Sequence, residues 1–228
     1  MSTRRQGHLI ALGDGVYTIR RVARILRPQG VTVKKIQYWL NKGLLGEPIR
    51  RGARGKPHLL SFEQLLKVRT IQQLRNSGFP LQRITPAIRK LSSYLFEHLF
   101  DEEWYELEFF HSGKSGVGVM DSRGRAVEVE TGQWIMSETL EELSDFLRKT
   151  REDWVRREID IVGFPRLVSN ARILGGAPIV RGTRIETSFL AYMAQSLGEE
   201  EVLELYPRLD EDTLQQAVEF EDVEPLAA

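Results

Sequence analysis

The stretch VTVKKIQYWLNKGLL, residues 31–45, decides the fold of the first third of the chain. Thr32 is a residue type favoured at a helix N-cap, and Gly43 suits the left-handed position at which helices often end. Between them, apolar residues recur at helical spacing, at Ile36, Trp39 and Leu40. The pattern predicts a helix that starts after Thr32, ends before Gly43 and buries one stripe.

A second helix is predicted immediately upstream, in VYTIRRVARIL, residues 16–26. Thr18 is placed to cap its start. The apolar positions again follow helical spacing, at Ile19, Val22, Ala23 and Leu26. RPQG, residues 27–30, interrupts the pattern with a proline and a glycine. Two helices joined by a short turn that contains glycine are typical of the helix-turn-helix motif, whose second helix enters the major groove of DNA.

A strongly basic segment, EPIRRGARGKPHLLSF (residues 47–62), follows the second helix. Its cations lie among glycines and prolines, and a strand is predicted over residues 58–62. A basic hairpin in this position is typical of a wing that contacts backbone phosphates. Ser61 is then placed to cap a third helix, in SFEQLLKVRTIQQLRNSGF (residues 61–79), and further helical spacing follows the break at residues 78–80.

The segments YTIRRVARIL, GVTVKKIQYWLNKGLL and LLSFEQLLKV, together with the wing, resemble the MerR-type winged-helix DNA-binding domain over about residues 16–90. The resemblance implies that Lys34, Gln37 and Tyr38 face DNA from the recognition helix. Gln37 stands where that family commonly has arginine, and Leu40 where it commonly has glutamate, which leaves the operator sequence open. The metal-sensing cysteines of some relatives are absent, so a metal-responsive switch is not expected.

The expected DNA interface combines both helices and the wing. Its residues are Thr18, Arg20, Thr32, Lys34, Lys35, Gln37, Tyr38, Arg50, Arg51, Arg54, Lys56 and His58. Two roles stay open for Tyr38, which either packs in the core or contacts a phosphate through its hydroxyl group.

Positive and negative charge are separated along the chain. The whole sequence has 32 Lys and Arg residues and 32 Asp and Glu residues, so its formal net charge is zero. Residues 1–95, however, hold 19 of the basic residues and only 3 of the acidic ones, which leaves the rest of the chain strongly acidic. This separation predicts a nucleic-acid-binding half joined to an acidic half with a different role.

The central part of the chain mixes strand and helix signals. DEEWYELEFF, residues 101–110, is interpreted as a solvated acidic face, because it lacks the ligand spacing of a metal site. GVGVMDSRGRAVEVETGQWIM, residues 116–136, predicts a small β-meander from its alternating valines and turn residues. SETLEELSDFLRKTREDWVRREI, residues 137–159, predicts a long amphipathic helix. This helix either pairs with its own copy in a dimer or packs on the meander, and the sequence favours neither.

Glycines beside arginines in ILGGAPIVRGTRI, residues 173–185, raise the question of a phosphate site. Neither the P-loop pattern nor the dinucleotide-binding glycine pattern is present. Short apolar runs instead alternate with Gly175–Gly176 and with Gly182. Because glycine supplies the backbone freedom of tight turns, this pattern predicts short extended segments joined by tight turns.

Three helices are predicted after these turns. TSFLAYMAQSLGEEEVLELYPRL, residues 187–209, forms a helix pair with a turn at Gly198, and DEDTLQQAVEFE, residues 210–221, adds a helix capped by Asp210. Over residues 165–222 the chain is similar to the family named domain of unknown function 433. The resemblance implies a β-hairpin with a three-helix, homeodomain-like bundle. Such domains occur in antitoxins of VapBC-type toxin–antitoxin pairs, whose toxins are PIN-like ribonucleases.

These patterns together predict an α+β fold that is mainly α, with three domains. A winged helix-turn-helix domain spans residues 15–95, an acidic linker or dimerisation region with the meander and long helix spans residues 96–162, and an antitoxin-like domain of family 433 spans residues 163–224. No stretch approaches the length of a membrane span, and no secretory signal core is found. A cytoplasmic, nucleoid-associated location is therefore expected.

The predicted function is that of a homodimeric DNA-binding antitoxin, which binds double-stranded operator DNA, represses its own operon and neutralises a PIN-like ribonuclease toxin. The alternative is a stand-alone dimeric MerR-like regulator, whose C-terminal domain serves dimerisation or ligand sensing. Neither an enzyme nor a cofactor or metal site is expected, because four scattered histidines and no cysteine provide no catalytic constellation. Arg181 and Arg184 are the candidate partner-binding residues, although capping of local carbonyl groups is favoured for them.

Overall fold

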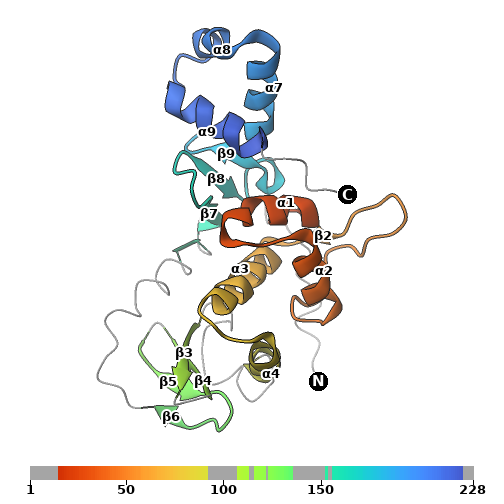
Figure 1. Ribbon diagram of the computed structural model, residues 1–228, viewed down its shortest axis with the longest axis vertical. Coiled ribbons are helices and arrows are strands. Elements are labelled where there is room, and N and C mark those ends of the chain that lie inside the picture. Colours follow the sequence, from red (N-terminus) through yellow and green to blue (C-terminus); the bar gives the residue numbers. More distant parts are fainter. Residues whose placement is uncertain are drawn as a thin grey trace. The chain divides into compact units, whose positions relative to one another are not determined.

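The computed structural model describes residues 15–91, 107–112, 116–121, 123–135, 152–153 and 156–222. They belong to two compact units. The first unit combines the chain up to Gln37, Pro48–Leu65 and the chain from Arg157 onward, and the second combines Tyr38–Glu47 with Leu66–Arg156. Helices and small antiparallel sheets make up both units, which confirms the predicted α+β class (Figure 1).

The helix-turn-helix has the boundaries that its sequence predicts. Its elements are α1 (Ile19–Ile25), a 3-10 turn (Arg27–Gln29) and α2 (Val33–Asn41). The Thr18 hydroxyl accepts a hydrogen bond from the Arg21 N–H at 3.2 Å, and the Thr32 hydroxyl accepts one from the Lys35 N–H at 3.3 Å. Gly43, with φ at 73°, follows the end of α2. Both predicted N-caps and the predicted C-terminal glycine are therefore confirmed.

The strand after the wing is shorter than expected. β2 (Leu59–Leu60) pairs antiparallel with β1 (Tyr17–Thr18), which directly precedes α1. The strand predicted over residues 58–62 is wrong at its end, because Phe62 already begins α3 (Phe62–Asn76). A capping box sets this boundary: the Ser61 N–H donates to Gln64 Oε1 at 3.0 Å, and the Gln64 N–H donates to Ser61 Oγ at 3.2 Å.

Residues 156–222 form a three-stranded antiparallel sheet and three helices. The strands, in the order β7–β8–β9, are Glu158–Asp160, Leu167–Asn170 and Pro178–Val180. The helices are α7 (Thr187–Leu197), α8 (Glu199–Leu205) and α9 (Glu211–Asp222). Asp210 caps α9 as expected, since its carboxylate accepts the Thr213 N–H at 2.8 Å. The hydrogen bonds from Thr213 lower the pKa of the Asp210 carboxyl, which keeps this cap ionised.

β7 replaces the end of the helix that the sequence predicts over residues 137–159. Arg157 has φ at 57°, a left-handed conformation that cannot continue a helix, and Glu158 then pairs with Asn170 of β8. The predicted helix is therefore wrong at residues 158 and 159. Apart from residues 152–153 and 156–159, it lies outside the described residues.

The described part of the second unit includes α4 (Leu81–Leu91) and a four-stranded meander. Its strands, β3 to β6 in order, are Glu108–Ser112, Gly116–Met120, Ala126–Glu128 and Trp134–Ile135. The predicted meander thus gains β3, which includes residues that the sequence assigned to an acidic face. Arg69 of α3 and Asp153 form a buried ion pair of 2.6 Å in this unit. Within the described ranges, none of the helices has the length and apolar character of a membrane span.

Tyr17 of β1 lies at the centre of the first unit, where its side chain is fully buried. Its ring contacts Phe62 with 6.4 Å between the ring centroids, and its hydroxyl oxygen lies 3.5 Å from Ser169 Oγ on β8. Gly176 lies directly against the ring, because a methyl group at that position would overlap it. The glycine pair of residues 175–176, predicted only to form a turn, therefore receives an aromatic side chain from the opposite end of the sequence.

We expect Gly176→Ala to lower the free energy of unfolding more than Gly182→Ala does. Both glycines have positive φ, 82° and 74°, so backbone strain costs about 1–2 kcal/mol at either position. A Cβ at Gly182 has nothing within 4 Å, whereas one at Gly176 overlaps the Tyr17 ring, which adds about 1–3 kcal/mol. Urea unfolding of the two variants measures the difference, and equal losses would contradict the contact.

The burial of the Tyr17 hydroxyl also determines how we expect stability to change at alkaline pH. Burial raises the pKa of its hydroxyl from the ordinary value of 10.0 to about 12. Between pH 10 and about pH 12 the folded state keeps this proton, whereas the unfolded chain has lost it. A contribution of about 2–3 kcal/mol to the free energy of unfolding is therefore present below pH 10, and it is lost as the pH rises from 10 to about 12. We expect Tyr17→Phe to flatten the fall in unfolding free energy over the same window. The exposed Tyr192→Phe serves as the control and should leave the wild-type slope unchanged.

Candidate nucleic-acid interface

α2 presents a polar face and a buried face. Lys34, Gln37 and Tyr38 are exposed and lie three or four residues apart along the helix, which places them on one side. Ile36 and Trp39, with 0% and 3% of their surface exposed, occupy the buried side. Tyr38, whose role the sequence leaves open, is 48% exposed. The exposed side of α2 thus presents hydrogen-bonding groups that suit the edges of bases in a groove.

Three of the expected DNA-binding residues also stabilise the helix-turn-helix itself. The hydroxyl oxygens of Thr18 and Thr32 accept the capping hydrogen bonds of α1 and α2, which leaves their hydroxyl hydrogens available as donors to a phosphate oxygen. Lys35 Nζ donates to the Gly30 carbonyl at 2.7 Å, so its charge lies at the turn between the helices. These contacts position the start of α2, the end that enters the groove in helix-turn-helix proteins.

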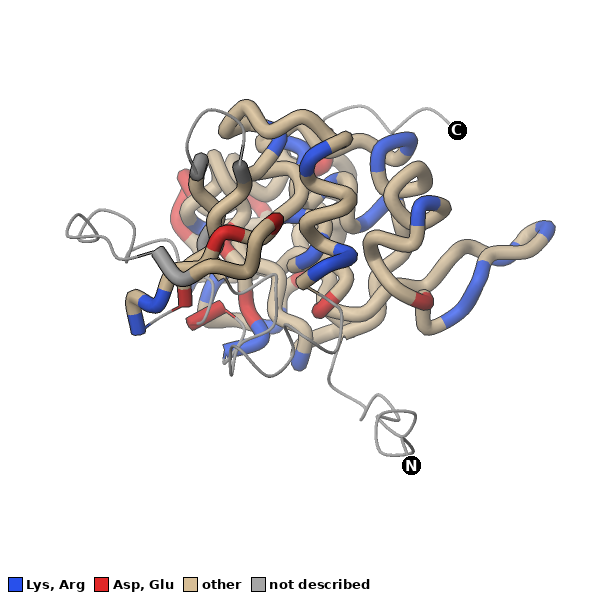
Figure 2. The backbone as a smooth tube through the Cα atoms, turned by 90° about the horizontal axis from the view of Figure 1, so that it is seen from below, with Lys and Arg blue, Asp and Glu red and all other residues tan. Residues whose placement is uncertain are grey.

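The wing, residues 50–59, is a hairpin closed by backbone pairing of Arg50 with Leu59 and of Ala53 with Lys56. It projects away from α1, and basic residues follow one another along it (Figure 2). Its exposed cations are Arg50, Arg51, Arg54 and Lys56. An exposed basic hairpin beside a recognition helix is suited to contact with backbone phosphates.

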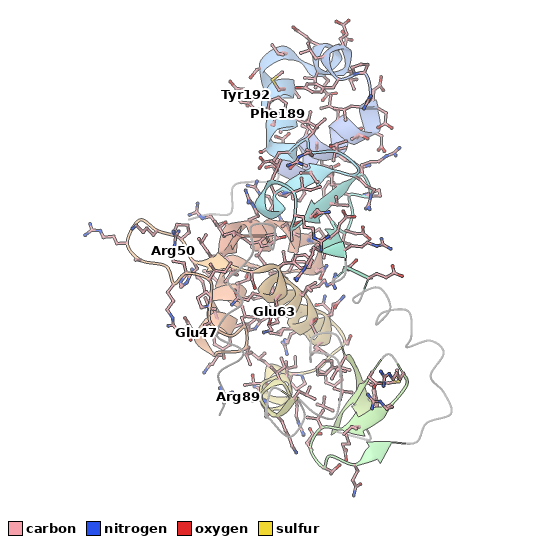
Figure 3. The ribbon with its side chains drawn as sticks, turned by 180° about the vertical axis from the view of Figure 1, so that it is seen from behind. Glu47, Arg50, Glu63, Arg89, Phe189 and Tyr192 are labelled. Atoms are coloured by element: carbon pink, nitrogen blue, oxygen red, sulfur yellow. The ribbon has the colours of Figure 1, made fainter. Side chains whose placement is uncertain are left out.

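His58 holds the base of the wing together. Its Nδ1 accepts a hydrogen bond from the Gly52 N–H at 3.0 Å, and a Cβ at Gly52 would lie only 2.9 Å from its ring. The imidazole is half-buried as a result, and only Nε2 is left for a contact with DNA. Arg50 is exposed, and its Nη2 donates to the Pro57 carbonyl of the same hairpin at 3.5 Å (Figure 3).

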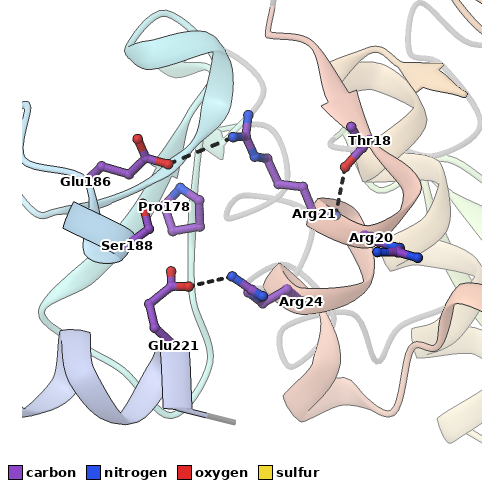
Figure 4. A pocket seen from close by; sticks show the side chains of 8 residues that line it. All are labelled: Thr18, Arg20, Arg21, Arg24, Pro178, Glu186, Ser188 and Glu221. Atoms are coloured by element: carbon purple, nitrogen blue, oxygen red, sulfur yellow. Dashed lines mark hydrogen bonds and ion pairs between the residues drawn. The ribbon is translucent and has the colours of Figure 1, made fainter. Parts of the chain in front are cut away.

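The three arginines of α1 have different surroundings. All three line a cavity that also includes residues of the C-terminal part, and Arg20 is exposed whereas Arg21 and Arg24 are half-buried (Figure 4). Arg21 lies 3.9 Å from the Glu186 carboxylate, and Arg24 forms a short ion pair with Glu221 of α9. Carboxylates of the acidic half therefore neutralise two cations of the basic half, and Arg20 is the α1 arginine that remains exposed to a phosphate.

The two candidate partner-binding residues have different environments. Arg181 Nε donates to the Pro165 carbonyl at 3.0 Å, and its guanidinium pairs with Asp160 of β7 at 2.8 Å. This side chain therefore links the two edges of the C-terminal sheet. Arg184 is exposed, and its side chain makes no hydrogen bond or ion pair with another described residue.

The structure adds residues that the sequence analysis missed. Asn41 is exposed and lies four residues after Gln37, so it extends the polar face of α2, and helical spacing alone was enough to find it. Lys42 Nζ lies 5.6 Å from the centre of the Tyr38 ring, which keeps a cation beside that face. Across the described residues, no group of three or more His, Asp or Glu side chains is arranged to hold a metal ion.

Comparison with known families agrees with this geometry. Residues 17–91 match the family described as MerR HTH family regulatory protein. The N-terminal segment carries a MerR-type helix-turn-helix. The match supports a DNA-binding regulator, since the exposed face of α2 and the wing both belong to the matched MerR segment. Residues 167–220 match the family described as protein of unknown function DUF433.

The fold is similar to that of one solved protein over most of both chains. The crystal structure of Rv2018 from Mycobacterium tuberculosis matches with a TM-score of 0.53 and 14% sequence identity, and the match covers 89% of this chain and 96% of that one. No curated protein matches the chain. The likeness to Rv2018 therefore supports the fold alone.

We expect replacement of Arg50, Arg51 and Arg54 by alanine to weaken DNA binding. If each arginine neutralises one phosphate, the slope of log affinity against log salt decreases in magnitude by about 2.7 for each copy of the chain that binds. Fluorescence anisotropy with duplex DNA at several salt concentrations measures this slope. A control triple variant, with Arg123, Arg172 and Arg208 replaced by alanine, removes the same charge from exposed positions outside the MerR-type segment and should leave the slope unchanged. An unchanged slope in the wing variant contradicts the phosphate contacts.

Proposed function

We propose that this protein is a dimeric DNA-binding antitoxin, which represses its own operon and neutralises a PIN-like ribonuclease. The exposed MerR-type recognition helix with its projecting basic wing is the observation that carries the proposal. Lys34, Gln37 and Tyr38 of α2 contact base edges in the major groove, while the wing and Arg20 contact the flanking phosphates. Thr18, Thr32, Lys35 and His58 hold these elements in place and contribute secondary contacts.

A second copy of the chain completes the DNA-binding surface. One recognition helix contacts only a few successive base pairs, so a single helix-turn-helix reads a half-site. Two copies related by a two-fold axis read two half-sites about one helical turn apart, which matches a palindromic operator. Repression then follows from occupation of a promoter that contains such an operator.

The C-terminal part suits a protein partner better than a second contact with DNA. Its helices α8 and α9 expose many carboxylates, among them Glu199, Glu200, Glu201, Glu204 and Glu211. A surface of this charge repels backbone phosphates. The resemblance of residues 165–222 to domains of VapBC-type antitoxins favours a toxin as the partner.

The contact between α1 and the C-terminal carboxylates favours one alternative, a stand-alone regulator with a sensing domain. Glu186 and Glu221 reach Arg21 and Arg24 beside a cavity, so a small anion bound there would act directly on the DNA-binding part. The two functions differ in whether a ribonuclease is bound.

The test of the antitoxin function uses the full-length chain, because deletion of the C-terminal part would remove Ser169 and Gly176 from the Tyr17 side chain. We expect a PIN-like ribonuclease encoded beside the gene to co-purify with the protein, and co-expression to relieve its toxicity. The triple wing variant should still capture the ribonuclease while losing operator affinity, since the wing is not part of the C-terminal segment that we propose as the site of ribonuclease binding. Operator binding without any captured ribonuclease or relief of toxicity would instead favour the stand-alone regulator.

A further inference from the structure

Helix α7 has an apolar surface on the outside of the protein. Phe189, Tyr192 and Leu197 are 42%, 66% and 41% exposed, and they lie at positions i, i+3 and i+8 of one helix (Figure 3). Tyr206 extends this surface, because its ring packs edge-on against Phe189 with 6.2 Å between the ring centroids. We call these residues, together with the half-exposed Met193, the α7 stripe.

The opposite side of α7 is apolar as well. Leu190 is fully buried, and α7 packs against α9. None of the 11 residues of α7 is charged, although charged residues make up 28% of the whole chain. Ser188, Gln195 and Ser196 are the exposed polar residues of α7, and none of them is charged. An exposed apolar stripe on an uncharged helix is typical of an interaction site, and within the described part of this chain nothing covers the α7 stripe.

The two ends of this uncharged helix differ in the charges left for a partner, because Glu186, directly before α7, lies 3.9 Å from the Arg21 guanidinium. Arg184, exposed and without an ion-pair partner among the described residues, lies three positions before the first residue of α7. Glu199, Glu200 and Glu201, all exposed, follow its end after Gly198. The helix is roughly 16 Å long, so the positive end and the negative end are well separated.

We propose that the α7 stripe is the interface with a second copy of this chain, in which the two α7 helices pack antiparallel about a two-fold axis. This arrangement matches the charges, because each Arg184 then lies near the glutamates that follow α7 of the other copy, and the pairing occurs twice by symmetry. The acidic surfaces of α8 and α9 repel their own copies, whereas the uncharged stripe does not. Phe189 and Tyr192 supply the aromatic anchors that interface centres favour.

The inference deepens the proposed function, since it supplies the contact by which two helix-turn-helix segments reach a palindromic operator. It assigns a dimer contact to α7.

The first test places a charge in the stripe. Sedimentation equilibrium of the full-length chain should show a dimer, and Tyr192→Glu should raise its dissociation constant by at least about tenfold, because the substitution occurs on both sides of the axis. Val162→Glu, at an apolar position 49% exposed and outside α7, is the matched control and should leave the constant unchanged. Circular dichroism confirms that each variant is folded. A monomeric wild-type chain, or a dimer that Tyr192→Glu leaves intact, overturns the proposal.

The second test exchanges the flanking charges. Arg184→Glu places carboxylates opposite one another and should weaken the dimer about tenfold. Adding Glu200→Arg to the same chain restores opposite charges across the axis and should recover most of that loss. Adding Glu219→Arg, which restores the same net charge at an exposed position of α9, should not recover it. Equal recovery by the two double variants overturns the antiparallel arrangement.

Operator binding distinguishes failure of this inference from failure of the proposed function. If the α7 variants leave the dimer unchanged while the wing variant still loses DNA affinity, only the interface is wrong. If Tyr192→Glu separates the copies but the wild-type dimer binds no DNA, the interface stands and the DNA-binding function fails.

Discussion

Burial of the Tyr17 side chain is the interaction on which the first unit depends. Tyr17 belongs to β1, which pairs with the strand after the wing, and its ring contacts Phe62 at the start of α3. The same side chain is covered by Ser169 and Gly176 from the C-terminal sheet. One residue therefore joins the wing, the helix-turn-helix and the C-terminal part in a shared core. Because the hydroxyl is poorly solvated there, the site favours the neutral phenol strongly.

This shared core changes how the separation of charge along the sequence is to be interpreted. The sequence places its cations in the first half and its carboxylates in the second, which suggests two independent ends. In the structure the ends meet at α1, where Glu186 and Glu221 pair with Arg21 and Arg24. The cations of the wing and of α2 belong to other surfaces, so the acidic half neutralises only part of the basic half. A protein partner of the C-terminal part therefore acts close to the DNA-binding elements.

Local signals predicted much of this fold, and long-range contacts account for what was missed. The caps at Thr18, Thr32 and Asp210 were correctly predicted because each depends on residues within one helical turn. Gly163 and Pro165 mark the turn before β8, but the strand β7 was missed because Glu158 gains its partner from Asn170, beyond that turn. Arg157, in addition, has a conformation that its residue type does not predict. The role of Gly176 depends on Tyr17, more than 150 positions earlier, and so no local pattern contains it. The DNA-facing residues of α2 were predicted from the resemblance to the MerR-type domain, whereas the engagement of His58 within the wing required the structure.

The proposed arrangement separates three kinds of contact by their chemistry. Cations on the wing and α2 meet phosphates and base edges, carboxylates on α8 and α9 repel nucleic acid, and the uncharged α7 meets its own copy without electrostatic cost. In such a dimer the second half-site binds at a high effective concentration, because the first contact already holds the operator nearby. The affinity for the whole operator then depends on the α7 interface as well as on the wing. A partner that binds the C-terminal part can consequently change repression by altering dimerisation, without touching a single residue that contacts DNA.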